Sequence, residues 1–513
     1  MRIKSKSEAY SRLLSTNKII EIRKFRQKIV NFETKSEVPS TAKTVKYLVN
    51  DQVAEFLNKQ SLCNNLLNNQ KFIKSFIKAE QYSRKIWYPL PRKWIHIVNK
   101  DEKIANVLIC NFLWELYKIK KYSKLIRSIY MFFLKQLIYE PIKFRNRYIN
   151  INKNYVYVNN FHSNMSETGE FNFINWFKTQ EKLENSYFVH SNKKFSNSKN
   201  VIFYPNFLVP RSLKDRTYLF ISALKYLQYY ILFSKMKYGF NLNFVELFRT
   251  YFICKHYEPS KNIFIFREEM RLCTPIWAHH ASLLNERVIY IEQSQSIEPD
   301  IEKGIQIDDD FEKLVTWPEV WTVTQERVIY LKKYNENKTK IYRCVGLPWA
   351  DDLVNPILNF NGNSIAVFDV EPHRKYFGLS TYNLYGLNEI GFSVSFLQDI
   401  VECAHKLGYL VYHKPKRNIG RKRYGEYTKL LNTLTNRFPR NYLLISPETS
   451  IKRIAENVNF IIATPFTSAI YAGKFSSAKR AYYDPLNTGI STSRDSKVKV
   501  IYGRKALSHW LSE

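Results

Sequence analysis

Several features that define other classes of protein are missing from this 513-residue chain. Its six cysteines are scattered, no two of them have metal-ligand spacing, and a chain of this length does not need disulfides to fold. With only 14 glycines, it contains no Gly-x-x-x-x-Gly-Lys and no Gly-x-Gly-x-x-Gly after a strand. These absences argue against a zinc protein, a disulfide scaffold, a nucleoside triphosphatase and a dinucleotide-dependent oxidoreductase.

Long apolar runs are also missing. The most apolar stretch, 217–233, contains Lys225 and Gln228 and falls short of the ~20 apolar residues that a membrane span requires. The first residues are basic, but neither an apolar core nor a small-residue cleavage site follows them, so we expect no signal peptide. The sequence therefore predicts a protein of the reducing cytoplasm.

Acidic residues are scarce, with 45 against 79 basic ones, and the formal net charge is +34. Such a field attracts nucleic acid, anionic lipid or nucleotide sugars without choosing among them. The segments 1–30 and 111–147 each carry nine basic residues and two acidic ones, and the second interleaves them with aromatic residues. Helices of this kind lie on anionic membranes, but the more common arrangement buries the aromatic residues and leaves the lysines in solvent.

Short apolar runs alternate with helical patterns after residue 200, as parallel β-α-β units require. Turn-forming residues between Gly346 and Asn363 interrupt this alternation and indicate a linker. We therefore predict an α/β protein with two Rossmann-like domains facing a cleft. The predicted division is a basic α-helical extension over 1–150, an irregular connection over 151–198, a first domain over 199–346, a linker over 347–363, a second domain over 364–500 and a C-terminal helix over 501–513.

Ligands of open parallel sheets bind beyond the carboxyl ends of the strands, and two such ends in the second domain suit an anion. The cationic run of His413, Lys414, Lys416 and Arg417, stiffened by a proline, follows a predicted strand at 409–412. Thr467 and Ser468 follow a strand at 460–463 and begin a predicted helix, whose free N–H groups and dipole favour a phosphate.

Two further strand ends carry carboxylates. Asp369 and Glu371 follow the strand at 365–368, where one of them is placed to act as acid or base; equally, Asp369 only caps the loop. Ser446 and Glu448 follow the strand at 442–445, in the N-cap and first-turn positions of a predicted helix, so simple capping is an equal interpretation.

A polar cluster is also predicted in the first domain, from Arg267, Glu268, Glu269, His279, His280 and Glu292. Adjacent histidines point in different directions on a helix, so this pair is a poor metal site. No metal site is predicted elsewhere.

The strand end Phe460-Ile461-Ile462-Ala463-Thr464-Pro465-Phe466-Thr467-Ser468, with Tyr483-Asp484-Pro485 after it, resembles the bacterial polysaccharide biosynthesis family named for its Pro-Phe-Thr-Ser motif. The runs 366–370 and 414–417 are similar to other landmarks of that family, and the resemblance covers about residues 260–490. It implies a glycosyltransferase that builds surface polysaccharide, such as capsule, O-antigen or lipopolysaccharide.

The order of these elements is also similar to that of GT-B sialyltransferases and capsular Kdo transferases. In those enzymes a His-Pro or Lys-Pro turn and a later Ser/Thr pair hold the phosphate of a CMP-sugar, and an intervening Glu holds the ribose. The resemblance implies a GT-B-like fold and a donor site formed by His413, Lys414, Lys416, Arg417, Ser446, Glu448, Thr467 and Ser468. Proline follows Lys414 here and not His413, so either side chain is a candidate for the phosphate contact.

The implied donor is a CMP-activated acidic sugar of the nonulosonate or Kdo type, and the implied acceptor is a glycan or lipid-linked glycan. No cofactor and no metal are expected, and the expected location is cytoplasmic, including the inner face of the membrane. One alternative keeps the fold and transfers a polyol phosphate from a CDP-alditol, because the Lys-Pro turn resembles those enzymes too. A basic nucleic-acid-binding protein is the other, but it does not explain polar groups at successive strand ends.

Overall fold

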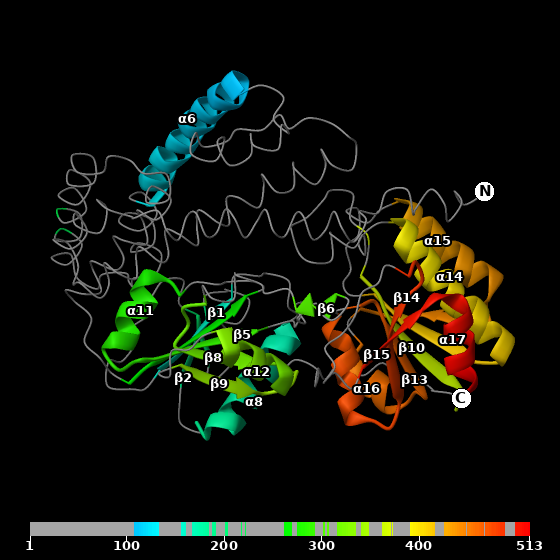
Figure 1. Cartoon of the computed structure of the whole chain (residues 1–513). Coiled ribbons are helices and arrows are strands. Elements are labelled where there is room, and N and C mark those ends of the chain that lie inside the picture. The colour runs from blue at the N-terminus through cyan, green and yellow to red at the C-terminus, as the bar shows by residue number, and fades with distance from the viewer. Residues whose placement is uncertain are drawn as a thin grey trace.

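The structure is a computed structural model and describes residues 107–132, 155–160, 167–183, 187–190, 201–203, 217, 221, 261–268, 274–292, 301–302, 305–306, 315–334, 340–347, 362–370, 372, 390–415, 425–447, 449–465, 467–487 and 498–513. Two separate parallel sheets organise the described chain, and each has helices packed against it (Figure 1). The predicted α/β class with two Rossmann-like sheets is confirmed. Of the predicted N-terminal extension, only helix α6 (Val107–Phe132) lies within the described residues.

The first sheet has seven parallel strands in the order β3-β2-β1-β4-β5-β8-β9. The chain starts in the middle, moves to one edge and then crosses to the other side, which is the doubly wound order of Rossmann folds. The strands are β1 (Tyr155–Asn160), β2 (Tyr187–His190), β3 (Val201–Phe203), β4 (Ile263–Glu268), β5 (Arg287–Glu292), β8 (Glu319–Thr322) and β9 (Ile341–Cys344). A separate antiparallel pair is formed by β6 (Ile301–Glu302) and β7 (Ile305–Gln306).

Apolar clusters lie on both faces of this sheet, which explains why its central strands are nearly continuous apolar runs. Helix α8 (Glu167–Glu181) covers one face with Phe173, Ile174 and Phe177. Helices α11 (Ile276–Leu283) and α12 (Gln325–Tyr334) contribute to the cluster on the other face.

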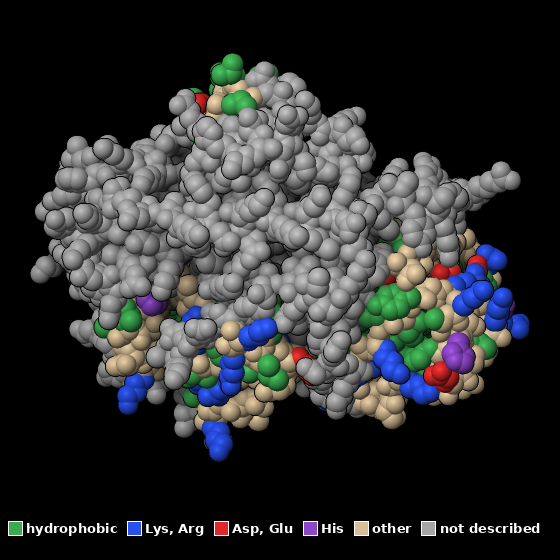
Figure 2. Space-filling model, in the orientation of Figure 1, with side chains coloured by type: hydrophobic (Ala, Val, Ile, Leu, Met, Phe, Trp, Pro, Cys, Tyr) green, Lys and Arg blue, Asp and Glu red, His purple; other side chains and the backbone are tan. Residues whose placement is uncertain are grey.

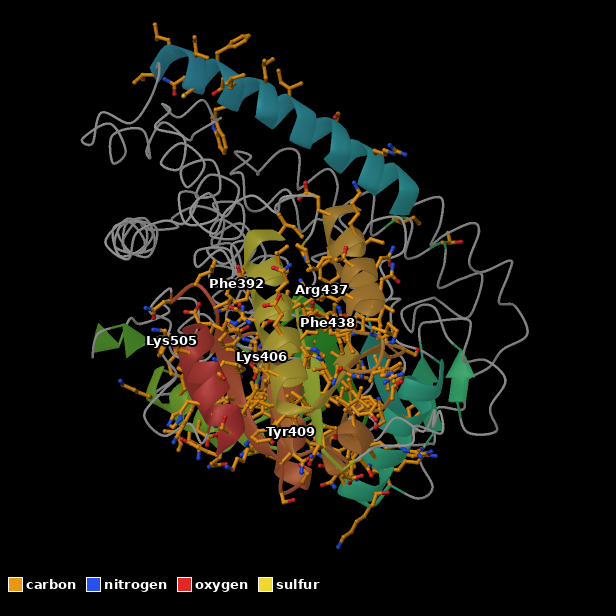
Figure 3. All side chains as sticks on the ribbon, turned by 90° about the vertical axis from the view of Figure 1, so that its right-hand side faces the viewer. Phe392, Lys406, Tyr409, Arg437, Phe438 and Lys505 are labelled. Atoms are coloured by element: carbon orange, nitrogen blue, oxygen red, sulfur yellow. The ribbon has the colours of Figure 1, made fainter. Side chains whose placement is uncertain are left out.

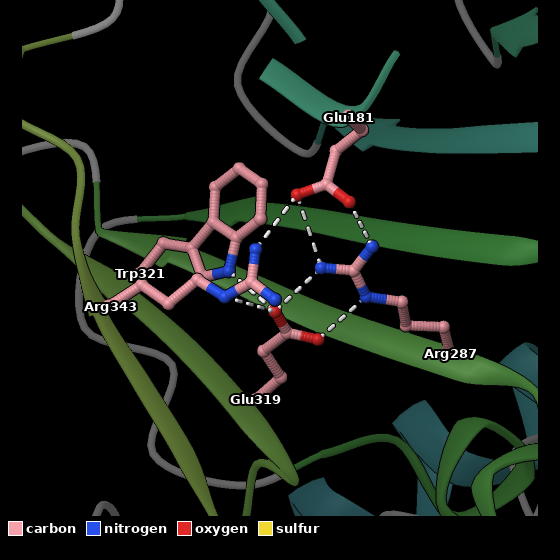
Figure 4. A network of polar contacts seen from close by, with 5 residues as sticks. All are labelled: Glu181, Arg287, Glu319, Trp321 and Arg343. Atoms are coloured by element: carbon pink, nitrogen blue, oxygen red, sulfur yellow. Dashed lines mark hydrogen bonds and ion pairs between the residues drawn. The ribbon is translucent and has the colours of Figure 1, made fainter. Parts of the chain in front are cut away.

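A network of charged side chains joins strands β5, β8 and β9 of the first sheet to helix α8 (Figure 4). Glu319, at the start of β8, accepts hydrogen bonds from Arg287 at 2.7 and 2.8 Å and from Trp321 Nε1 at 2.7 Å. Glu181 binds Arg287 as well, and it accepts a bond of 3.0 Å from Arg343. Burial opposes the charge of Arg287, but the hydrogen bonds to Glu319 and Glu181 outweigh it and raise the pKa of this guanidinium. The network ties the end of α8 to three strands, and two of its residues, Arg287 and Glu319, begin β5 and β8.

The second sheet has six parallel strands in the order β12-β11-β10-β13-β14-β15, again a doubly wound arrangement. The strands are β10 (Ser364–Phe368), β11 (Leu410–Lys414), β12 (Tyr442–Leu444), β13 (Phe460–Ala463), β14 (Lys479–Asp484) and β15 (Lys499–Tyr502). All residues of β10 and β13 are buried, as central strands covered on both faces must be.

Helices α14 (Ile390–Leu407), α15 (Gly425–Arg437) and α17 (Gly503–Ser512) cover one face of the second sheet and lie side by side (Figure 3). On the other face, α16 (Ile451–Glu456) and the 3-10 helix η6 (Ser468–Phe475) pack together. Two residues that follow first-sheet strands, Val323 and Leu347, are buried in the apolar cluster of this second face. The two α/β units therefore share a core on the α16 side.

Glycine at 408 ends α14 for a conformational reason. It has a φ of +76°, and the Tyr409 N–H donates to the Ala404 carbonyl at 2.9 Å, which is the pattern of a left-handed helix cap. The chain turns there directly into β11.

Some predictions of elements need correction. The irregular connection predicted over 151–198 is wrong, because that segment contains β1, α8 and β2 of the first sheet. Its weak periodicity arises because β1 buries Val156 and Val158 between tyrosines and ends in asparagines. The C-terminal helix is confirmed, whereas the predicted linker lies mostly outside the described residues and its boundaries stay predictions.

Candidate functional site

The topological switch of the second sheet lies between β10 and β13, which are neighbours although the chain leaves them toward opposite faces. After β10 it continues to α14, and after β13 it continues to η6. The Thr464 N–H donates to the Phe368 carbonyl at 3.0 Å and holds the two strand ends together. Ligands of doubly wound sheets bind at this kind of position.

The predicted helix start after β13 is present in altered form. Thr467 is the N-cap of η6, its N–H donates to the Thr464 carbonyl at 3.1 Å, and its carbonyl accepts from Ile470. Its Oγ1 is buried and has no hydrogen-bond partner within the described parts of the chain. Ser468 is partly exposed at the first position of the 3-10 helix. A buried donor without a partner is costly in a folded protein, so Thr467 is suited to meeting a bound anion.

The cationic run begins within β11, and its first two residues are divided between the two faces of the sheet. Val411 belongs to the cluster under α14 and α15, and Tyr412 belongs to the cluster under α16 and η6. Because side chains alternate along a strand, His413 lies on the α14 side and Lys414 on the side of η6. Lys414 and Pro415 are buried, while Lys416 and Arg417 lie outside the described residues.

The loop after β12 corrects the predicted helix start. Ser450 is the N-cap of α16, and its side chain accepts a bond from the Arg453 N–H, so Ser446 is not the N-cap. Ser446 was predicted as the N-cap because Pro447 after it favours the first turn of a helix. In the structure the Thr449 N–H donates to the Ser446 carbonyl, which forms a turn before the helix begins. Glu448 lies outside the described residues.

This loop contains a residue that the sequence did not single out. Thr449 is 3% exposed, and its Oγ1 lacks a hydrogen-bond partner among the residues described. The one signal available was the run of hydroxyl residues around Pro447. Since α16 and η6 pack together, Thr449 and Thr467 precede neighbouring helices on the same face of the sheet.

Asp369 and His413, predicted as separate functional groups, are brought together. The Asp369 Oδ1 lies 3.2 Å from His413 Nε2, Tyr427 donates its hydroxyl hydrogen to Asp369 Oδ2, and His413 Nδ1 lies 2.6 Å from Tyr442 Oη. Asp369 is 2% exposed and His413 is fully buried. Glu371, predicted beside Asp369, lies outside the described residues.

Of the polar residues predicted in the first unit, Arg267 and Glu292 contact other side chains. Arg267 is buried with its guanidinium 3.7 Å from the centre of the Phe173 ring, and Glu292 forms an ion pair of 2.7 Å with Arg327. Burial lowers the pKa of His280. The described residues contain no group of three potential metal ligands and no helix long and apolar enough to cross a membrane.

The two Rossmann-type sheets, with polar groups at the carboxyl ends of the second sheet, form a GT-B-like fold, which one class of nucleotide-sugar glycosyltransferases shares. The family model described as polysaccharide biosynthesis PFTS motif protein matches residues 226–511. The chain belongs to this family of polysaccharide biosynthesis proteins. The predicted resemblance is confirmed.

Solved structures with related folds share little sequence with the chain. The UDP-GlcNAc 2-epimerase of Methanocaldococcus jannaschii is 10% identical with a TM-score of 0.36, over 70% of this chain and 93% of that one. The wall teichoic acid polymerase TagF is 11% identical with a TM-score of 0.38, over 77% and 88%. A glycosyltransferase from Rickettsia africae is 12% identical with a TM-score of 0.35, over 70% and 88%. Similarity this low says nothing about the substrate, and no curated protein matches the chain.

Proposed function

We propose that the chain is a glycosyltransferase, and that it transfers an acidic sugar from a CMP-activated donor to a glycan or lipid-linked glycan. The donor phosphate is bound where the chain leaves β11 and β13. The observation that carries the proposal is the buried Thr467 hydroxyl, which lacks a partner among the described residues and lies on the same face of the sheet as Lys414. A lysine and hydroxyl donors around one phosphate form charge-assisted hydrogen bonds, which are stronger than neutral ones.

The remaining roles follow from the positions of the predicted residues. Lys416 and Arg417 continue the cationic run beyond Lys414, and we assign them to the donor phosphate with Thr467 and Ser468. Glu448 is assigned to the ribose, and Ser446 lines the same loop. Because both oxygens of Asp369 face protein side chains, we assign the acid or base role to Glu371.

The donor is tested by titrating CMP, CDP and UDP into the protein by calorimetry. The proposal predicts that CMP binds more tightly than UDP, and that incubation with a CMP-linked acidic sugar and a lipid-linked glycan releases free CMP. Selective binding of CDP, with transfer of a polyol phosphate from a CDP-alditol, would establish the alternative reaction on the same fold. Tighter binding of UDP than of CMP would contradict both.

We also propose reversible binding to an anionic membrane at the cytoplasmic face. Helix α6 exposes Leu108 (77%), Phe112 (62%), Leu116 (46%) and Ile119 (64%), which recur every three or four residues and so share one face. Hydrophobic side chains of α6 appear in green at the top of Figure 2. The basic residues of the segment add electrostatic attraction to anionic lipid.

Liposome co-sedimentation tests this binding. Vesicles with phosphatidylglycerol should bind the protein at low salt and release most of it at high salt, because exposed charges are screened. Replacement of Phe112 and Ile119 by Ser should weaken binding further. Equal sedimentation with neutral vesicles, or none with anionic ones, would contradict the proposal.

A further inference from the structure

Four buried residues from three adjacent strands of the second sheet and from helix α15 form a cluster. Asp369 directly follows β10, His413 is in β11, Tyr442 begins β12, and Tyr427 comes from α15. We call these residues the Asp369 cluster. Each is at most 2% exposed, so none of them is open to solvent.

The contacts within the cluster form a chain. Tyr427 binds one oxygen of Asp369, the other oxygen faces His413 Nε2 at 3.2 Å, and His413 Nδ1 meets the Tyr442 hydroxyl at 2.6 Å. Asp369 Oδ1 and His413 Nε2 lie at the distance of an ion pair, but they are not aligned as a hydrogen bond. Neither atom has a hydrogen-bond partner among the described residues. Buried polar groups that bind one another in this way favour a single arrangement, because the loss of one removes a partner of the next.

The cluster lies directly beside the site proposed for the donor. His413 and Lys414 are consecutive in β11 and point to opposite faces, so the side chain held by the cluster and the side chain offered to the phosphate share one stretch of backbone. Asp369 likewise begins the loop that leads to Glu371. Any shift of His413 would move the backbone of Lys414.

We propose that the Asp369 cluster positions Lys414 for the donor phosphate, and that its four side chains do not touch the donor. This inference rests on the proposed function. It gives Asp369 and His413 positioning roles in place of direct chemical ones. Within the predicted cationic run, His413 positions the backbone, and Lys414, Lys416 and Arg417 bind the donor phosphate.

The test is a double-mutant cycle measured as CMP affinity. His413→Asn should weaken CMP binding by about tenfold in the otherwise unaltered protein. In a Lys414→Met background, His413→Asn should change CMP affinity by less than about twofold, because the Lys414 contact with the phosphate is already absent.

A matched pair of variants separates positioning from stability. Tyr427→Phe removes a hydroxyl that binds the buried Asp369, and Tyr483→Phe removes a hydroxyl that binds the buried Asp399 at 2.8 Å. The second pair packs in the same apolar cluster, but β14 is separated from β11 by β10 and β13. Both variants should lower the melting temperature, and only Tyr427→Phe should weaken CMP binding.

The outcomes distinguish this inference from the proposed function. If the unaltered protein binds CMP but His413→Asn has equal effects with and without Lys414, His413 acts independently and the inference is wrong. Equal loss of CMP affinity in Tyr427→Phe and Tyr483→Phe would show that the Asp369 cluster contributes only to general stability and does not position Lys414. If CMP, CDP and UDP all fail to bind the unaltered protein, the proposed function fails and this inference fails with it.

Discussion

Replacing Glu319 by Gln should destabilise the first α/β unit, because this carboxylate joins two arginines and a tryptophan in the network of Figure 4. Glutamine keeps the shape and an acceptor for Trp321, so the change removes mainly the charge. Glu319 is 3% exposed, and breaking a buried ion pair costs about 3 to 5 kcal/mol. The side chain of Arg287 is 29% exposed and keeps Glu181 as a partner, so we expect about 2 to 3 kcal/mol.

The assay is thermal unfolding followed by circular dichroism, where such a loss lowers the melting temperature of a unit of this size by roughly 4 to 12 °C. The matched control is Arg437→Gln, which removes a 3.5 Å ion pair with Glu402 from a side chain that is 64% exposed. An exposed pair contributes about 0 to 1 kcal/mol, so this variant should melt close to the unaltered protein. Equal melting temperatures for Glu319→Gln and Arg437→Gln would refute the reasoning.

Three other predictions concern the second unit. Gly408→Ala should destabilise it by about 1 kcal/mol in denaturant unfolding, because the φ of +76° is strained for alanine. Beyond its chain neighbours, no atom of the described residues lies within 4 Å of the added carbon, so a steric clash does not contribute. An unchanged midpoint would contradict this. Thr449→Val should raise the melting temperature of the free protein, because it removes a buried hydroxyl that lacks a partner among the described residues. It should weaken CMP binding if that hydroxyl meets the donor. A fall in melting temperature would show that the hydroxyl has a partner in the free protein. Transferase activity should survive EDTA, because cationic side chains are proposed to neutralise the donor phosphate; loss that Mg²⁺ or Mn²⁺ restores would contradict this.

The parallel strands of the second unit were predictable because burial on both faces leaves an unmistakable apolar run. The predicted strands at 365–368 and 460–463 match β10 and β13 almost residue for residue. Strand β1 escaped prediction because only two of its residues are clearly buried aliphatic side chains, and its stability comes from parallel pairing with β2 and β4. Such long-range pairing has no local signal in the sequence.

The positions of the candidate site residues were predictable, but their directions were not. The doubly wound order brings Asp369, Lys414 and Thr467 to one edge of the sheet, as the sequence indicated. Whether His413 or Lys414 points toward the donor depends on the register of β11 in the sheet, and a shift by one residue reverses the answer. Ser450, and not Ser446, caps α16 because the helix begins later than the proline suggested.

The most direct test of the donor site is CMP binding by the double variant Thr467→Ala/Ser468→Ala, measured by calorimetry together with the melting temperature of the free protein. Thr467 makes no side-chain cap bond to η6, so the fold should tolerate the change. If both hydroxyls bind a desolvated phosphate, each loss costs on the order of 1.5 to 3 kcal/mol. The account predicts a fall in CMP affinity of at least about a hundredfold with little change in melting temperature. CMP binding that survives the double substitution would contradict the central claim.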